Sequence, residues 1–278
     1  MKKSLALLAL SVSAFAAQAA DWSDTTLTYR QGSKFAEPFN NKDISKNILG
    51  LTHASGYKYG SNFFNVDFLM SDSKDPAAAG SSTGAQEVYA VYRNTVDLSK
   101  VTGNAYKFGI VRGLGVTGGF DFNSKADAGY NSKKRMLVVG PTLMLDVPGF
   151  LNVSLLELFE SNSPYSTYTH SGVGRYTYKS HPMVGLAWGI PFNVASVPLS
   201  FEGYANFIAS KGKNEFGGDT AAETNIDMQV MYDLTGTKTF KVGVEYQYWK
   251  NKFGNNASGP AGSGAFAKTP MIRAEYHF

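Results

Sequence analysis

The sequence predicts an all-β fold, a closed antiparallel β-barrel of about twelve strands that crosses a lipid bilayer. Three observations point to this class. Apolar and polar residues alternate with a period of two along most of the chain, long and short connectors follow one another in turn, and the chain ends in an alternating segment with aromatic residues on one face. A period of two is the signature of a strand, and long loops at one end with short turns at the other are typical of membrane barrels.

Composition excludes several other classes. Of the 278 residues, 43% are hydrophobic, 14% are aromatic and only 17% are charged, and the mean hydropathy is -0.19. A helical membrane bundle would need apolar runs of about 18 residues or more, and no such run follows residue 20. A disordered chain would contain few aromatic residues. The absence of Cys removes disulfides, thiolate metal sites and cysteine nucleophiles.

Residues 1–19 have the three parts of a secretory signal peptide. Two lysines form the basic start, Leu5 to Phe15 the apolar centre, and Ala17-Gln-Ala19 a small-residue cleavage site. We expect residues 20–278 to form a single barrel domain. Without the two signal lysines, 24 basic residues stand against 22 acidic ones, a net charge of +2. This small excess is dispersed along the chain, which argues against nucleic acid as a partner.

The clearest strand runs from Phe240 to Trp249, where every second residue is apolar or aromatic. Leu199 to Phe207 and Asn225 to Tyr232 repeat the pattern. No convincing 3.6-residue period follows the signal peptide, so the pattern predicts strands and no helices. The twelve expected strands lie near 24–33, 44–54, 62–70, 85–96, 108–122, 134–145, 150–160, 176–190, 198–208, 223–233, 239–250 and 269–278.

The connectors carry independent information about the two ends of the barrel. Those after odd-numbered strands are long and rich in Gly, Ser, Asn and Asp, whereas those after even-numbered strands are short, except for 97–107. The long connectors are 34–43, 71–84, 123–133, 161–175, 209–222 and 251–268. In an outer-membrane barrel the long loops are extracellular and the short turns periplasmic. No change in composition along the chain marks a second domain.

The last strand favours a membrane barrel over a soluble one, in which strands also alternate. Ile272, Tyr276 and Phe278 share one face of this strand, while charged residues occupy the other. A terminal aromatic strand of this kind resembles the C-terminal signal by which bacterial outer-membrane barrels are recognised for insertion. Tyr276 and Phe278 are therefore the expected assembly signal, with barrel assembly machinery and outer-membrane lipid as partners. The alternative is the edge strand of a soluble sandwich that ends in Phe by chance.

The expected location is the bacterial outer membrane, because a closed barrel leaves no strand edge unpaired in lipid. Twelve strands suggest a narrow passage or a plugged interior, since eight-stranded barrels are filled by side chains and sixteen-stranded porins hold a water-filled channel. The inward faces carry charges of both signs with aromatic rings between them. This combination suits a small, largely neutral solute with a flat ring and hydroxyl groups.

The candidate solute-binding residues in the lumen are Tyr89, Arg93, Asp121, Glu202, Tyr204, Asp227, Glu245, Trp249 and Arg273. Pairing between strands is the alternative role for the charged members, because an isolated buried charge is costly. The sequence holds no Gly-x-Ser-x-Gly elbow, no His-Glu-x-x-His and no phosphate-binding loop. We therefore expect no enzyme activity, no cofactor and no metal. An outer-membrane lipase in which His53 or His181 partners a serine is a further hypothesis.

Several blocks of the sequence resemble one known family. They are Asp21-Trp-Ser-Asp-Thr25, Asn47-Ile-Leu-Gly-Leu-Thr-His-Ala-Ser-Gly-Tyr-Lys-Tyr-Gly60, Asn62-Phe-Phe-Asn-Val-Asp67, Gly140-Pro-Thr-Leu-Met-Leu-Asp-Val-Pro-Gly149, Ala187-Trp-Gly-Ile-Pro191 and Tyr248-Trp-Lys-Asn-Lys-Phe-Gly254. With these blocks the chain resembles the nucleoside-specific channel-forming outer-membrane family (Tsx-like) over nearly all of residues 20–278. The resemblance implies a monomeric twelve-stranded barrel for passive uptake of nucleosides. It also implies a second role as a phage or colicin receptor through the loops. The alternative function is a plugged barrel that acts only as such a surface receptor.

Overall fold

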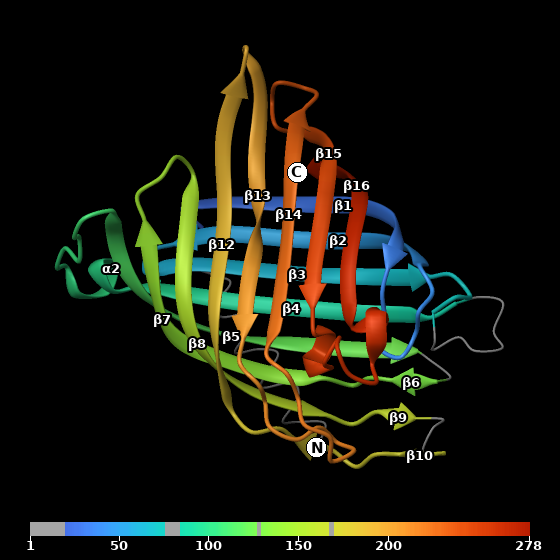
Figure 1. Ribbon diagram of the computed structural model, residues 1–278. Helices are drawn as coiled ribbons and strands as arrows, with labels where there is room; N and C mark the ends of the chain where they lie inside the picture. Colours follow the sequence, from blue (N-terminus) through green and yellow to red (C-terminus); the bar gives the residue numbers. More distant parts are fainter. Residues whose placement is uncertain (1–19, 76–83, 127–128, 167–169) are drawn as a thin grey trace, which may run out of the picture.

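The computed structural model describes residues 20–75, 84–126, 129–166 and 170–278 (Figure 1). In this part of the chain, twelve long strands form an antiparallel sheet that closes on itself, which confirms the predicted fold class. The predicted signal peptide covers residues 1–19 and lies outside the described residues. The long strands are β1 (Trp22–Phe35), β2 (Ile44–Tyr57), β3 (Gly60–Ser71), β4 (Gln86–Asp97), β5 (Val111–Ala126), β7 (Arg135–Leu145), β8 (Phe150–Asn162), β12 (His181–Val194), β13 (Val197–Ile208), β14 (Glu223–Asp233), β15 (Phe240–Lys250) and β16 (Phe266–His277).

The sheet closes where the first and last strands meet. Strand β1 pairs with β2 on one side and with β16 on the other, and Thr26 aligns with His277. In Figure 1, strands β12 to β16 cross in front of β1 to β4, as tilted strands on opposite walls of a barrel do. Twelve strands spaced about 4.8 Å apart and tilted by about 40° give a backbone radius of about 12 Å. The inward side chains narrow this opening further.

The two ends of the barrel differ in their connectors. Short turns join β2 to β3, β7 to β8, β12 to β13 and β14 to β15. At the other end, the loops contain β6 (Tyr130–Asn131), β9 (Tyr165–Ser166), β10 (Ser171–Gly172), β11 (Tyr176–Thr177) and the short helices η2 (Lys252–Gly254) and η3 (Gly262–Ala265). Strands β6, β9 and β10 form a small separate sheet, and β11 pairs with β8. The end with the long loops is the extracellular one.

The long connector at the short-turn end contains a helix, α2 (Leu98–Thr102), where the sequence predicted none. Asp97 caps this helix, because its side chain accepts hydrogen bonds from the backbone N–H groups of Ser99 at 2.8 Å and Lys100 at 3.4 Å. Gly103 ends the helix with φ of 75°. One turn of helix is too short to leave a 3.6-residue period in the sequence. Within the described residues, no helix is long and apolar enough to cross a membrane.

The strand expected over 176–190 lies further along the chain in the structure: β12 begins at His181, and Tyr176–Thr177 form the separate strand β11. The turn that follows β12 is shorter than expected. The expected turn over 191–197 shrinks to Ala195 and Ser196, with φ of 46° and 72°. Positive φ at both central residues fits the twist of a two-residue hairpin. Strand β12 accommodates Pro191 because it pairs with β8 only as far as Gly189, so beyond that point one side of β12 needs no N–H donor. The hairpin projects beyond its neighbours in Figure 1.

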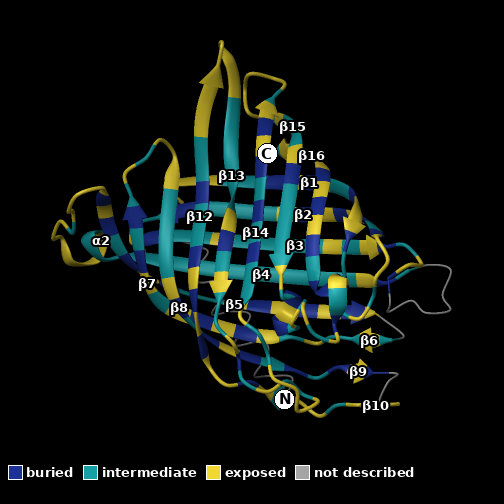
Figure 2. Cartoon of the chain, in the orientation of Figure 1, coloured by how far each residue is buried: buried dark blue, intermediate teal, exposed yellow. Residues whose placement is uncertain are grey.

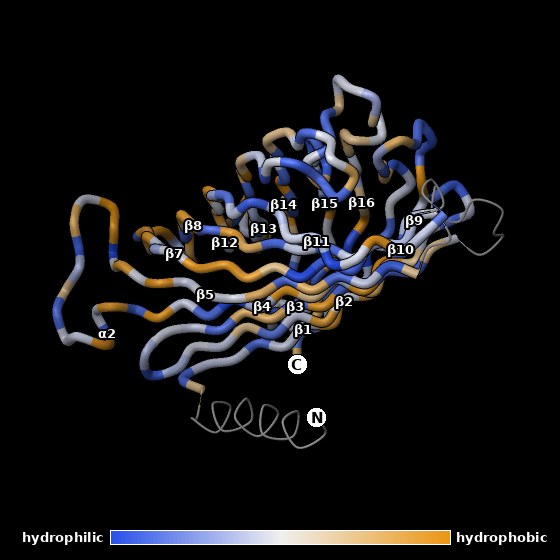
Figure 3. The backbone as a smooth tube through the Cα atoms, turned by 90° about the horizontal axis from the view of Figure 1, so that it is seen from below, coloured by the Kyte–Doolittle hydropathy of each residue, from blue (hydrophilic) through white to orange (hydrophobic). Residues whose placement is uncertain are grey.

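Apolar side chains cover the outer wall. Burial alternates along the strands in Figure 2, and hydrophobic and hydrophilic residues share the same strands in Figure 3. Because the inward residues of these strands are largely polar, the hydropathy of the whole chain averages close to zero. An outward apolar belt on a closed antiparallel barrel makes the protein an outer-membrane β-barrel. Exposed members of this belt include Leu27, Leu49, Leu51, Phe68, Phe120, Leu137, Val139, Leu155, Phe159, Phe207, Val244 and Ile272.

The terminal strand has the predicted phase. Ile272 and Tyr276 are exposed on the outer wall, whereas Arg273 and Glu275 at the alternate positions face inwards. Phe278 follows β16, is exposed, and donates its backbone N–H to the carbonyl oxygen of Thr25 at 2.9 Å. The rings of Tyr276 and Phe278 meet edge to face at 5.0 Å. The role of this aromatic end in assembly stays a prediction.

Apolar side chains also pack inside the barrel, along two parts of the inner wall. One cluster spans β7, β8 and β12, and the other joins β1, β2 and β16. Their members are almost fully buried although they face the lumen, so other side chains cover these parts of the wall. The members are Met136, Val138, Leu156, Leu158 and Met183 in the first cluster and Phe35, Ile44, Ile48 and Met271 in the second.

Candidate functional site

The strand register places the nine predicted solute-binding residues on the inner face of the barrel. Tyr204 aligns with Asp227 across β13 and β14, and Asp227 aligns in turn with Gln247 on β15. Aligned residues of neighbouring strands point to the same face of a sheet. The structure places eight of the nine residues in several polar networks, which the following paragraphs describe, while Tyr204 exposes its ring to the lumen. Whether they contact a solute stays a prediction.

Two arginines and three carboxylates form the first network. Arg30 Nη2 lies 2.5 Å from Asp67 Oδ1, and Arg30 Nη1 lies 3.4 Å from Glu245 Oε1. Arg273 lies 2.8 Å from Glu245 Oε2 and 2.6 Å from Glu275 Oε1. These side chains are almost completely buried, and an unpaired charge in such a place would cost several kcal/mol. The ion pairs therefore make the charged inner wall of β15, β16, β1 and β3 possible.

Gly50 on β2 makes room for this network. A Cβ atom at Gly50 would overlap Thr28 Oγ1 and would lie 2.9 Å from Asp67 Oδ1. The missing side chain lets Asp67 on β3 reach across β2 to Arg30 on β1. The ion pair thus spans three adjacent strands.

A second network lies on β4 and β5. Arg93 Nη1 lies 2.6 Å from Asp121 Oδ1, and the hydroxyl of Tyr89 donates to Asp121 Oδ2 at 2.9 Å. Lys134 in turn donates to the Tyr89 hydroxyl at 3.3 Å. Asp121 is thus satisfied by one cation and one hydroxyl, and Arg93 keeps part of its side chain accessible.

Two further predicted residues on β13 and β14 have neighbouring partners. Glu202 Oε1 accepts a hydrogen bond from Lys241 Nζ at 3.2 Å, and Asp227 Oδ2 accepts one from Gln247 Nε2 at 3.2 Å. Asp227 is buried, whereas Glu202 is partly accessible. The lumen charges therefore occur mainly as neutral pairs, with neither sign in large excess.

Aromatic rings mark the accessible section of the lumen. Tyr204 faces inwards and is 37% exposed, and Phe63, which aligns with the inward Arg93, is 42% exposed. An inward side chain with this exposure adjoins open space inside the barrel. The sequence reasoning missed Phe63, although its phase with the polar Asn65 and Asp67 places it on the inner face.

Trp249 and Glu245 were predicted to contact a solute, but both side chains are engaged by neighbouring residues. The Trp249 Nε1 donates to Glu223 Oε1 at 2.9 Å, its ring meets Phe253 edge to face at 4.8 Å, and Lys252 Nζ lies 4.8 Å from the ring centre. Glu245 is buried between Arg30 and Arg273. Trp249 packs at the extracellular end, and Glu245 holds the arginines in place.

An ion cluster around Glu37 lies at the extracellular end. Glu37 Oε1 lies 2.8 Å from Lys46 Nζ, 3.1 Å from Lys252 Nζ and 3.8 Å from Lys125 Nζ. Asp75 lies 3.0 Å from Lys125. We call these five residues the Glu37 hub. Glu37 and Lys252 come from the first and last extracellular loops. Alternation along the strands does not predict where the side chains of these loops lie.

Charge and burial act in opposite directions on the hub. Burial alone would raise the pKa of Glu37, but the attraction of Lys125, Lys252 and Lys46 outweighs it and holds that pKa well below its usual value. Burial lowers the pKa of Lys252, and Glu37 opposes this shift. Glu37 is therefore ionised at neutral pH and fixes the loop after β1 to β2, β5 and the loop after β15.

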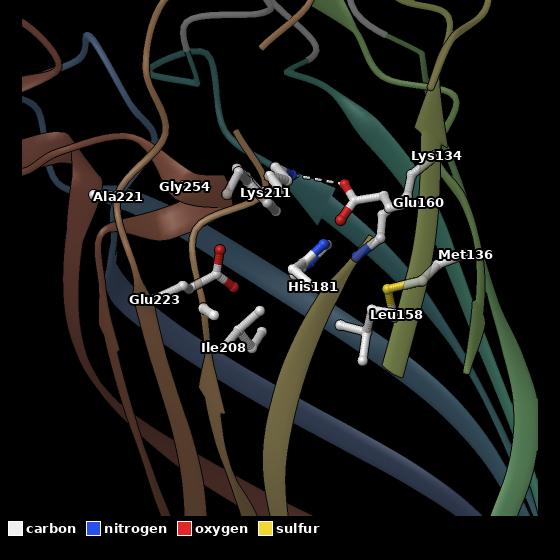
Figure 4. Close-up of a pocket in the computed structure, with 12 residues that line it drawn as sticks. Lys134, Met136, Leu158, Glu160, His181, Ile208, Lys211, Ala221, Glu223 and Gly254 are labelled. Carbon is white, nitrogen blue, oxygen red and sulfur yellow. Dashed lines mark hydrogen bonds and ion pairs between the residues drawn. The ribbon is translucent and has the colours of Figure 1, made fainter. Parts of the chain in front are cut away.

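A small polar cavity lies beside the hub, lined by Lys134, Glu160, His181, Lys211 and Glu223 above a floor that includes Met136, Leu158 and Ile208 (Figure 4). Its volume is about 30 Å³, the size of a single water molecule. Lys211 Nζ lies 2.7 Å from Glu160 Oε1. The cavity is too small for a nucleoside-sized solute, so it belongs to the packing of the extracellular end.

The lipase hypothesis needs a histidine beside a serine. His53 lies on the outer wall, with its Nδ1 2.8 Å from Thr25 Oγ1, and the Nδ1 of the buried His181 lies 2.9 Å from the carbonyl oxygen of Lys179. Among the described residues, neither ring has a serine as hydrogen-bond partner. The geometry that this hypothesis requires is therefore missing from the described part of the chain.

Comparisons with known proteins add no family. No family model matches the chain, and no curated protein matches it either. A solved translocator domain of the autotransporter NalP from Neisseria meningitidis is similar with a TM-score of 0.48 at 11% identity, covering 100% of this chain and 96% of that one. An outer membrane channel from Pseudomonas putida F1 gives 0.48 at 12% identity, covering 92% and 95%. The KdgM porin in complex with disordered oligogalacturonate gives 0.40 at 11% identity, covering 91% and 99%.

Proposed function

We propose that the protein is an outer-membrane channel for small, largely uncharged solutes that combine a flat ring with hydroxyl groups, and that nucleosides are its substrates. The observation that carries this proposal is the accessible section of the lumen, where Tyr204 and Phe63 expose their rings beside Arg93 and Glu202. Stacking of a base on an aromatic side chain contributes about 1 to 3 kcal/mol. The neighbouring polar groups would bind the hydroxyls of the sugar.

The pairing of the lumen charges supports a neutral solute over an ion. Because Arg30, Arg273 and Arg93 each have a carboxylate within 2.8 Å, the inner wall offers no strong field of one sign. A strongly anionic or cationic solute would have to compete with these existing pairs. The resemblance of the sequence to the nucleoside-specific family is in line with this proposal.

The test is conductance in a planar bilayer with the purified protein. We expect stepwise ion currents that added adenosine partly blocks. Replacing Tyr204 by Ala should weaken the block about tenfold, the equivalent of one lost stacking contact. Phe207→Ala on the same strand removes a ring from the outer wall and is the matched control. Currents that adenosine does not change, or equal effects of both variants, would refute nucleoside selectivity.

A second candidate function is a plugged barrel that acts as a surface receptor. The buried Glu37 hub favours it, because the first and last extracellular loops are held inside the mouth by Glu37 and Lys252. This function predicts no solute flux in liposome swelling, together with loss of partner binding when an extracellular loop is deleted. Swelling of the liposomes in small sugars or nucleosides would support the channel function instead.

A further inference from the structure

The outer wall carries a cluster of cations at its extracellular end, at the start of β7 and on both sides of β11. Lys133, Arg135, Arg175 and Lys179 are all exposed there. Arg135 aligns with Ser161 on β8, and Ser161 aligns with Thr177 on β11, so the four positions lie on the two sides of β8. They alternate along the chain with Lys134 and with the buried Tyr178, whose side chains lie on the inner side. We call these four residues the outer basic cluster.

Arg175 is held in place by neutral groups. Its Nη1 donates to Ser161 Oγ at 3.1 Å and its Nη2 donates to the carbonyl oxygen of Lys133 at 3.2 Å. A guanidinium has five N–H donors, so three of them have no partner among the described residues. Partial desolvation and the nearby positive charge of Arg135 lower the pKa of Arg175, although it stays charged.

The cluster has no counter-charge among the residues that the structure describes. None of its four members forms an ion pair within the described residues. Other exposed cations of the loops do have partners, as Lys213 has in Asp219 at 2.7 Å. The nearest outward carboxylate along β8, Glu157, lies four residues from Ser161, about 13 Å along the strand at 3.3 Å per residue. Adjacent unpaired cations repel each other, so an anion from outside the chain would stabilise this arrangement.

An exposed apolar wall continues directly below the cluster towards the membrane. Leu137, two residues after Arg135, is 63% exposed and aligns with Phe159, which is 51% exposed. Val139 and Leu155 extend the wall and are exposed as well. The surface is therefore cationic at the level of the lipid headgroups and apolar at the level of the acyl chains.

We propose that this surface binds a phosphorylated lipid of the outer leaflet, with its phosphates on Arg135 and Arg175 and its acyl chains against Leu137 and Phe159. A guanidinium pair suits phosphate because it offers parallel N–H donors to two oxygens of one group. The position of the cluster on the lipid-facing wall favours a lipid over a soluble anion. This inference does not depend on what passes through the lumen.

The test uses the whole mature barrel in detergent micelles, with bis-phosphorylated lipid A as probe and native mass spectrometry as readout. We expect retention of lipid A by the unmodified protein and an apparent affinity about tenfold lower for the double variant Arg135→Gln, Arg175→Gln. The matched control is Lys250→Gln, Lys268→Gln, which removes the same charge from exposed, outward positions of β15 and β16. This control should stay within about twofold of the unmodified protein, since it leaves the cluster intact.

Two further arms separate the sources of the phosphate. The unmodified protein should retain dephosphorylated lipid A as weakly as the double arginine variant retains intact lipid A. Millimolar inorganic pyrophosphate should not displace intact lipid A from the unmodified protein. The resistance of each folded barrel to denaturation by detergent without heating shows that the variants are assembled. Equal retention by both double variants, equal retention of the dephosphorylated lipid, or full displacement by pyrophosphate would each overturn the proposal.

Discussion

Replacing Glu37 by Gln should release the first and last extracellular loops from the barrel. Glutamine keeps the shape of the side chain. It removes the negative charge that lies within 4 Å of all three lysines, Lys46, Lys252 and Lys125. Loss of one partner of a buried ion pair costs about 3 to 5 kcal/mol. We expect about 3 kcal/mol, because Asp75 still lies 3.0 Å from Lys125 and Lys252 still donates to the carbonyl oxygen of Ala36 at 2.8 Å.

The measurement is the free energy of unfolding by urea in lipid vesicles, followed by tryptophan fluorescence, with single-channel conductance as a second readout. Released loops should raise the conductance of the variant. The matched control is Asp219→Asn, which breaks the exposed pair with Lys213 and should cost less than about 1 kcal/mol. If Glu37→Gln changes stability and conductance no more than this control does, the reasoning about the hub is refuted.

Three more predictions follow from features described above. Gly50→Ala should destabilise the barrel by about 1 to 3 kcal/mol in the same urea assay, because its Cβ would crowd Asp67, and an unchanged midpoint would contradict this. Deletion of Phe278 should reduce outer-membrane assembly, measured by cell fractionation, without changing export across the inner membrane. Normal assembly of this variant would contradict a role of Phe278 as the assembly signal. Glu37 stabilises the loops fully above its usual pKa of about 4.3, and this effect is lost as the pH falls through its lower folded pKa. Conductance should therefore rise only at pH values well below about 4.3, and Glu37→Gln should lack this rise.

The period of two was sufficient to predict most strands and their inward faces. Alternation depends only on local geometry, so the phase of β14 and β15 could be read from Asp227 and Glu245 alone. The sequence could also show that charges of both signs face inwards. It could not show which charges pair, because Arg30 and Glu245 lie 215 residues apart and meet only in the closed barrel.

The errors have equally local causes. Helix α2 is too short to leave a period in the sequence. The strand expected to end at residue 190 continues to Val194, along a section where β12 has only one hydrogen-bonded neighbour. The Glu37 hub could not be predicted, since loops have no period that fixes where their side chains lie. Phe63 was missed because two adjacent Phe residues hide the alternation at that point, although only one of them faces the lumen.

The ion pairs between distant strands have a consequence for how the barrel assembles. Arg30 on β1 pairs with Glu245 on β15, and Lys252 after β15 pairs with Glu37 after β1, so these two ion pairs form only when the last strands join the first. Arg30 and Glu37 also have partners on nearer strands, Asp67 and Lys46, whereas Lys252 gains its carboxylate only on closure. A partly assembled chain would expose unpaired charges to a membrane that tolerates them poorly. Closure should therefore be cooperative, with few half-inserted species, because the final strand pairing also completes the ion pairs that join the first and last strands.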